Sequence, residues 1–162
     1  MKHPRNLVAG VRVRILVIAV LVMCLGLAGA VTSASGELLS AKGKVIAILA
    51  DDLFLGEAEG HLSGAGTLAI HSQQNPALTC LGEFTSSAEL GGLGRLHCSD
   101  GTTATFHFQR LTMFCGYGDG SSSRGAMSFA YGLSVEDANT YLKLPRGKKL
   151  TDNGNEPGLV SD

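Results

Sequence analysis

Two glutamates and a histidine in one short segment are the residues best spaced for acid–base chemistry. Glu57, Glu59 and His61 alternate with small residues, so an extended chain would hold them on one face, with neighbouring carboxylates about 6.5 to 7 Å apart. That separation suits a general acid and a general base acting on a glycosidic bond. Any solvated strand face produces the same spacing, however, and the sequence offers no evident aromatic platform for a sugar. We therefore interpret the three residues as a solvated face and expect no catalytic residues there.

Three histidines and one cysteine are candidates for a metal site. His71, His97, His107 and Cys115 share the parity expected to point outward from extended strands. No C-x-x-C or H-x-x-x-H spacing places two ligands on one local element. We expect exposed strand histidines, with no metal and no cofactor.

Signals for nucleophilic catalysis and anion binding are weaker. The sequence lacks the G-x-S-x-G pattern that places a nucleophilic serine on a tight strand-to-helix turn. Ser121 to Ser123 with Arg124 form a polar segment whose hydroxyls and guanidinium are suitable donors to an anion. Lys148 and Lys149 beside Arg146 form a small basic cluster. We interpret the first as a connector and the second as solvated charge, so the sequence predicts a protein that is not an enzyme.

The composition restricts the class of protein. The chain has 162 residues, which one hydrophobic core can serve. Its net charge of −1 lacks the basic excess of nucleic-acid-binding proteins, so we expect no nucleic-acid partner. Its 22 glycines follow no G-X-Y period, and 44% hydrophobic residues exclude full disorder.

The first 30 residues predict a signal peptide. Four basic residues precede any acidic one, and an apolar run from Ile15 to Ala30 ends in an A-x-A cleavage pattern. The run would span about 24 Å as a helix, short for a hydrocarbon core of about 30 Å. Cleavage after Ala30 would leave a net charge of −5, and we expect an exported protein, periplasmic or extracellular. An uncleaved membrane anchor through residues 15–30 and lipidation at Cys24 are the alternatives.

Apolar residues alternate with polar or small ones at period two between Gly43 and Gly132, without helical spacing. Turn residues divide this stretch into short runs. The sequence predicts an all-β antiparallel meander of about eight strands over 43–133, either a barrel or a strongly coiled sheet, after a linker at 31–42. On the second run the predicted inward residues are Phe54, Gly56, Ala58, Gly60 and Leu62.

Two segments, 64–70 and 92–98, share the pattern G-x-G-x-L-x-apolar. Glycine inside a strand indicates sharp curvature or the close approach of another backbone. A barrel or a strongly coiled sheet would use both.

Three cysteines follow the predicted signal peptide, and strand parity selects one pairing. Placing Cys80 opposite Cys98 also places Gly82 opposite Leu96 and keeps every inward residue inward. Antiparallel partners have Cα atoms about 4.5 to 5.5 Å apart, which a disulfide tolerates. We predict a Cys80–Cys98 bridge with Cys115 unpaired; three reduced thiols are the alternative.

The character changes after Gly132. Ser134 and Asp137 have capping-box spacing, which predicts one short helix at 134–145 that packs over an open end of the sheet. Pro145 would end this helix. The polar composition of 146–162 predicts a mobile tail.

Several motifs together resemble a group of small exported proteobacterial proteins of unknown function. They are G-A-G-T-L at 64–68, T-C-L-G-E-F at 79–84, G-L-G-R-L-H-C-S-D-G at 92–101, F-x-F at 106–108, S-R-G at 123–125, F-A-Y-G-L-S at 129–134 and A-x-x-Y-L-x-L-P-x-G-K at 138–148. The resemblance implies the same cysteine pair, whereas Cys115 departs from the pattern, and it implies no activity and no catalytic residues.

The sequence therefore predicts an exported cell-envelope protein with a binding, interaction or structural role. Its partner would be an envelope protein. The alternatives are a carrier that holds a small apolar ligand in a β-barrel cavity, and a domain held at the membrane by its N-terminal segment.

Overall fold

The computed structural model describes residues 40–87, 91–154 and 156–162. All of these belong to one compact unit, Glu37–Asp162. The predicted signal peptide lies outside the described residues, as does most of the predicted linker at 31–42. The last three linker residues already belong to the first strand, so the predicted start of the β domain at Gly43 is slightly late.

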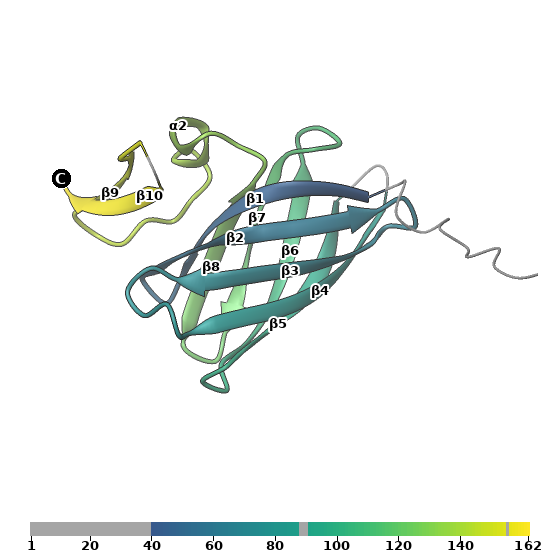
Figure 1. Ribbon diagram of the computed structural model, residues 1–162, viewed down its shortest axis with the longest axis horizontal. Coiled ribbons are helices and arrows are strands. Elements are labelled where there is room, and N and C mark those ends of the chain that lie inside the picture. The colour runs from purple at the N-terminus through teal and green to yellow at the C-terminus, as the bar shows by residue number, and fades with distance from the viewer. Residues whose placement is uncertain (1–39, 88–90, 155) are drawn as a thin grey trace, which may run out of the picture. The chain divides into compact units, whose positions relative to one another are not determined.

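Eight consecutive antiparallel strands close into a barrel (Figure 1). Each strand pairs with the next, and the first pairs with the last, which closes the barrel. The predicted all-β meander is confirmed, and of the two forms left open it is the barrel that forms. The strands are β1 (Ser40–Leu49), β2 (Asp52–His61), β3 (Ala65–Ser72), β4 (Thr79–Ser87), β5 (Gly91–Cys98), β6 (Thr103–Arg110), β7 (Gly116–Ser122) and β8 (Gly125–Tyr131).

Inside the barrel, large aromatic side chains alternate with glycines from strand to strand. Phe84 of β4 pairs with Gly66 on one side and Gly94 on the other. Phe106 of β6 likewise lies between Gly94 and Gly120. An eight-stranded barrel is only wide enough for side chains to fill it, so large residues need small neighbours in the same layer. Alternation of size across the strands therefore lets the barrel close around its core.

The Cys80–Cys98 disulfide is present, with an S–S distance of 2.00 Å, at the end of the barrel where β4 begins and β5 ends. Cys80 pairs directly with Cys98 and Gly82 with Leu96, as strand parity predicts. The two Cα atoms are 3.8 Å apart, closer than expected. Cys115 is a free cysteine, as predicted.

The helix after β8 is shorter than the sequence predicts. The residues that follow it form two strands rather than a tail. Helix α2 (Val135–Ala138) begins after Ser134, whose hydroxyl accepts a hydrogen bond from the Asp137 N–H. It ends well before Pro145. The expectation of a mobile tail at 146–162 is wrong, because β9 (Lys148–Asp152) and β10 (Pro157–Ser161) pair antiparallel.

This C-terminal segment packs on the outer face of β1, β2 and β8, whereas the sequence predicts packing over an open end of the sheet. Its Ala138, Leu142 and Leu150 are buried against a second apolar cluster outside the barrel. That cluster includes Ile46, Ile48, Leu53, Leu55 and Ala130 from the strands. Both faces of β1 are thus apolar, which indicates that another element covers its outer face. The period-two pattern alone does not predict this.

Two further contacts hold the segment in place. The Lys143 N–H donates to the buried Ser128 hydroxyl at 2.9 Å. The Tyr141 ring stacks on that of Tyr117, with centroids 4.2 Å apart. Within the described residues no helix has the length and apolar character needed to cross a membrane.

The glycine–aromatic alternation predicts a position-dependent cost of adding one methyl group. A Cβ at Gly94 would overlap the Phe106 ring and the Glu83 carbonyl, whereas one at Gly60 would make ordinary contact with Phe84 at 3.7 Å. We expect Gly94→Ala to lower the free energy of unfolding by about 1 to 3 kcal/mol and Gly60→Ala to leave it nearly unchanged. Urea denaturation measures both, and equal effects would contradict this account of the core.

The outer apolar cluster predicts that the C-terminal segment stabilises the barrel. Leu150 is 4% exposed, and its truncation to alanine should lower the free energy of unfolding by about 2 to 5 kcal/mol. Leu81→Ala is the control, because that side chain is 66% exposed on the barrel surface and should change stability by less than about 0.5 kcal/mol. A Leu150→Ala variant as stable as Leu81→Ala would show that the segment does not dock.

The disulfide closes a loop of 18 residues. On the chain-entropy model, the double variant Cys80→Ala, Cys98→Ala should lose about 3 kcal/mol of unfolding free energy. Cys115→Ser is the matched control, since its Sγ contacts only the Thr112 hydroxyl among the hydrogen bonds described, at 3.2 Å. Peptide mass spectrometry without reduction checks the pairing directly, and a free thiol at Cys80 would refute it.

Candidate functional site

The barrel is open to a cavity of about 630 Å³ at the end opposite the disulfide. The start of β1 and the ends of β2, β4, β6 and β8 surround it, together with the β2–β3 turn and the β6–β7 loop. We call this end the mouth. Its lining includes Val45, Ala58, Leu68, Phe84, Phe106, Phe108, Phe129 and Tyr131.

One wall of the mouth is aromatic. Phe84 and Phe108 meet edge to face with ring centroids 5.5 Å apart, and Phe108 meets Tyr131 in the same way at 6.0 Å. These rings come from β4, β6 and β8. Edge-to-face contacts of this kind fix ring positions relative to each other. The wall is therefore a connected aromatic surface.

The facing wall is made of small residues, which explains why the barrel is hollow here. Gly43 of β1 with Ala58 and Gly60 of β2 line the same cavity. These positions supply little volume beside the rings, so the mouth stays unfilled. Nearer the disulfide, Leu49, Phe54 and Leu96 are fully buried and fill the interior. The barrel is thus packed at one end and hollow at the other.

Polar groups at the mouth converge on Arg110, the last residue of β6. Its Nη2 donates to the Ser86 hydroxyl at 2.6 Å, and Ser86 in turn donates to the Gly64 carbonyl at 3.1 Å. Burial raises the pKa of Tyr131 and outweighs the opposing effect of the nearby Arg110 cation. The Tyr131 phenol therefore keeps its proton at neutral pH.

Exposed apolar side chains surround the mouth. Leu62 of the β2–β3 turn is 71% exposed, and Met113 and Phe114 of the β6–β7 loop are 68% and 64% exposed. All three also line the cavity. We call them the apolar rim. The prediction that Leu62 faces the barrel interior is wrong, because β2 ends at His61 and the chain turns there.

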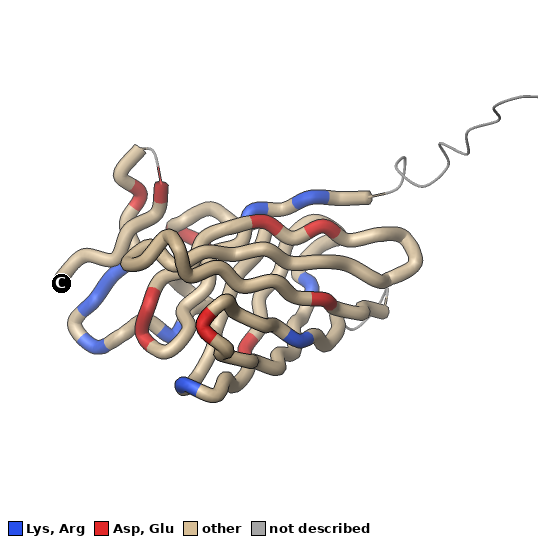
Figure 2. Tube along the Cα trace, turned by 60° about the horizontal axis from the view of Figure 1, so that its bottom comes forward, with Lys and Arg blue, Asp and Glu red and all other residues tan. Residues whose placement is uncertain are grey.

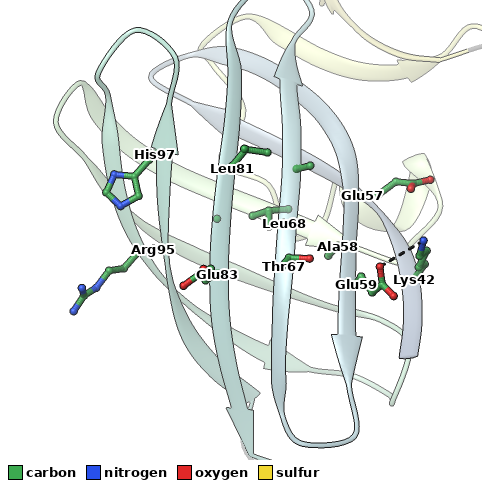
Figure 3. A pocket seen from close by; sticks show the side chains of 12 residues that line it. Lys42, Glu57, Ala58, Glu59, Thr67, Leu68, Leu81, Glu83, Arg95 and His97 are labelled. Atoms are coloured by element: carbon green, nitrogen blue, oxygen red, sulfur yellow. Dashed lines mark ion pairs between the residues drawn. The ribbon is translucent and has the colours of Figure 1, made fainter. Parts of the chain in front are cut away.

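A second depression, of about 730 Å³, lies on the outer surface of β1 to β5 (Figure 3). Figure 3 shows Glu57, Glu59 and Lys42 on one side of it and Arg95 and His97 on the other. Lys42 forms an ion pair with Glu59 at 3.4 Å; the lysine side chain is exposed and the glutamate side chain partly exposed. Charges of both signs are interspersed along the strands here (Figure 2). This surface is open and mixed in charge.

The electrostatics of Glu59 argue against a role as general acid. A hydrogen bond from Ser40 lowers the pKa of this carboxyl, and the Lys42 ammonium lowers it further, whereas partial desolvation opposes them. A general acid needs a raised pKa at neutral pH. Glu57 and Glu59 do lie on the outer strand face as predicted, while His61 lies at the mouth.

The metal candidates are not brought together. In the described part of the chain no three His, Cys, Asp or Glu residues are close enough to hold a metal ion. His97 lies at the outer depression, His107 pairs in register with Asp119, and His71 lies beside Gln73. Cys115 lies in the β6–β7 loop against Thr112.

The remaining sequence candidates have local partners. Arg124 forms an ion pair with Asp100 at 3.0 Å, and the Ser122 hydroxyl donates to the Gly125 carbonyl, so this segment is a hairpin connector. Lys148 donates to the Ser161 hydroxyl at 3.3 Å across the β9–β10 pair. The sequence analysis did not identify Arg110, although its parity matches that of the inward Phe106 and Phe108.

Comparison of the chain with protein-family models, with curated proteins and with solved structures finds no match.

Proposed function

We propose that this protein is an exported binding protein without catalytic activity, which holds a small apolar ligand in the mouth of its barrel. The observation that carries the proposal is the mouth cavity with its connected aromatic wall. Of the roles that the sequence leaves open, this geometry favours the carrier.

The size and lining of the cavity support ligand binding. Small-molecule sites commonly have volumes of about 300 to 1,000 Å³ and are mostly apolar with a few polar groups. The mouth, at about 630 Å³, has this character. The apolar rim extends the lining out to solvent, which gives an apolar ligand a continuous path into the barrel.

The polar groups of the inner wall suit recognition. The Arg110 guanidinium is a hydrogen-bond donor without acceptor atoms. Burial raises the pKa of Tyr131, so its phenol also donates a hydrogen bond rather than abstracting a proton. Export is supported by the apolar N-terminal segment and by the disulfide, since disulfides persist in oxidising compartments.

The apolar rim also favours a second candidate, in which the mouth binds another envelope protein. Exposed apolar residues in a cluster commonly mark interaction sites. On this alternative the rim, rather than the cavity, would supply the binding energy, and filling the cavity would not matter.

Filling the cavity separates the two candidates. Ala58 points into the mouth from β2, and Ala69 is exposed on the outer face of β3. We expect Ala58→Phe to weaken binding of the uncharged fluorescent probe N-phenylnaphthylamine at least about tenfold, because the added ring occupies the cavity. Ala69→Phe adds the same ring outside the barrel and should leave the affinity unchanged.

Unfolding midpoints of both variants confirm that each is folded. Loss of probe binding in Ala69→Phe but not in Ala58→Phe would move the site to the outer depression and overturn the proposal. Native mass spectrometry of the protein as purified is an independent test, with a retained small molecule expected in the wild type and lost in Ala58→Phe.

A further inference from the structure

Arg110 crosses the mouth rather than pointing to solvent. It shares the inward parity of Phe106 and Phe108 on β6, and its guanidinium reaches Ser86 on β4, two strands away. On β5, between them, Gly92 pairs with both Ser86 and Phe108. The Phe108 ring lies over Gly92, and the Arg110 guanidinium bonds Ser86 at the rim beyond it. The cation is thereby held over the aromatic cavity.

The Arg110 guanidinium has more donors than the described residues supply side-chain acceptors. Arginine carries five N–H groups, and the one side-chain hydrogen bond described for it goes to the neutral Ser86 hydroxyl. In the described ranges no carboxylate lies within 4.0 Å of Arg110 to form an ion pair. A half-buried cation is stabilised when an anionic group joins it with charge-assisted hydrogen bonds.

Tyr131 provides a second donor beside the same place. Gly116 pairs with Arg110 on one side and with Tyr131 on the other, and the Tyr131 hydroxyl lies over Gly116. The phenol and the guanidinium therefore flank one glycine on the inner wall. Both can donate to an acidic group that enters from the mouth.

We infer that the ligand is amphipathic, with an acidic head group bound by Arg110 and an apolar chain in the aromatic cavity. This inference rests on the proposed function and adds the chemical class of the ligand to it. A carboxylate and a phosphate share the required chemistry, because both accept paired hydrogen bonds from a guanidinium. Tyr131 acts as a secondary donor.

Probes that differ only in the head group test this inference. Dodecanoate and dodecanol carry the same chain, and each is titrated against bound N-phenylnaphthylamine at neutral pH. We expect the wild-type protein to bind dodecanoate about ten to a hundred times more tightly than dodecanol, as a charge-assisted hydrogen bond would give. Dodecyl phosphate in parallel distinguishes a phosphate head group from a carboxylate.

Removing the cation should remove the preference for the acid. Arg110→Met replaces the guanidinium with an unbranched apolar side chain, so we expect the ratio of the dodecanoate affinity to the dodecanol affinity to fall to about one. Arg95→Met is the matched control, because Arg95 is exposed on the outer face of β5 and should leave the acid preference intact. Tyr131→Phe should reduce the preference only in part.

The outcomes separate this inference from the proposed function. Equal affinities of the wild type for acid and alcohol, or an acid preference that survives in Arg110→Met, overturn the acidic head group and leave the apolar ligand standing. Failure of every chain to displace the probe, with no effect of Ala58→Phe on probe binding, overturns the proposed function and this inference with it.

Discussion

The width of an eight-stranded barrel is the constraint on which the rest of this structure depends. Eight strands enclose a space that one layer of side chains can fill, so each layer must combine large residues with very small ones. The chain meets this requirement by placing glycine opposite phenylalanine on neighbouring strands, as at Gly94 and Phe106. At the mouth, Gly43, Ala58 and Gly60 of β1 and β2 add little volume to the rings of the other strands, and a cavity remains. The distribution of large and small side chains along the strands therefore determines both the packed core and the candidate site.

Much of the barrel was predictable because its interactions are local or obey strand parity. Period-two alternation gave the strands, and the parity that put Gly82 opposite Leu96 also put Cys80 opposite Cys98. Closure was not predictable, because β1 and β8 meet through hydrogen bonds that leave no mark on either strand's own pattern. The docked C-terminal segment was missed for a related reason: Leu150 is a single apolar residue among charged ones, and only its partners on the outer face of the barrel explain it.

The candidate site was harder to predict than the fold because chemistry-based spacing pointed elsewhere. Glu57 and Glu59 have the spacing of a general acid and base, yet they lie on an open surface of mixed charge. The mouth is built from residues that come from six strands, and no local spacing links Phe84, Arg110 and Tyr131. Strand parity does indicate that Arg110 points inward, because it shares the parity of Phe106 and Phe108. What the sequence could not supply was the empty volume next to it.

Pairing between the first and last strands also governs how the chain reaches its native state. Val45 pairs with Tyr131, so the ring of strands cannot be completed until almost the whole domain has been synthesised. The C-terminal segment then packs across that same seam, on Ile46 and Ala130. Long-range pairing of this kind slows folding. A nascent chain therefore cannot close the barrel before β8 has left the ribosome, and the outer apolar face of β1 and β2 stays uncovered until the segment after β8 follows.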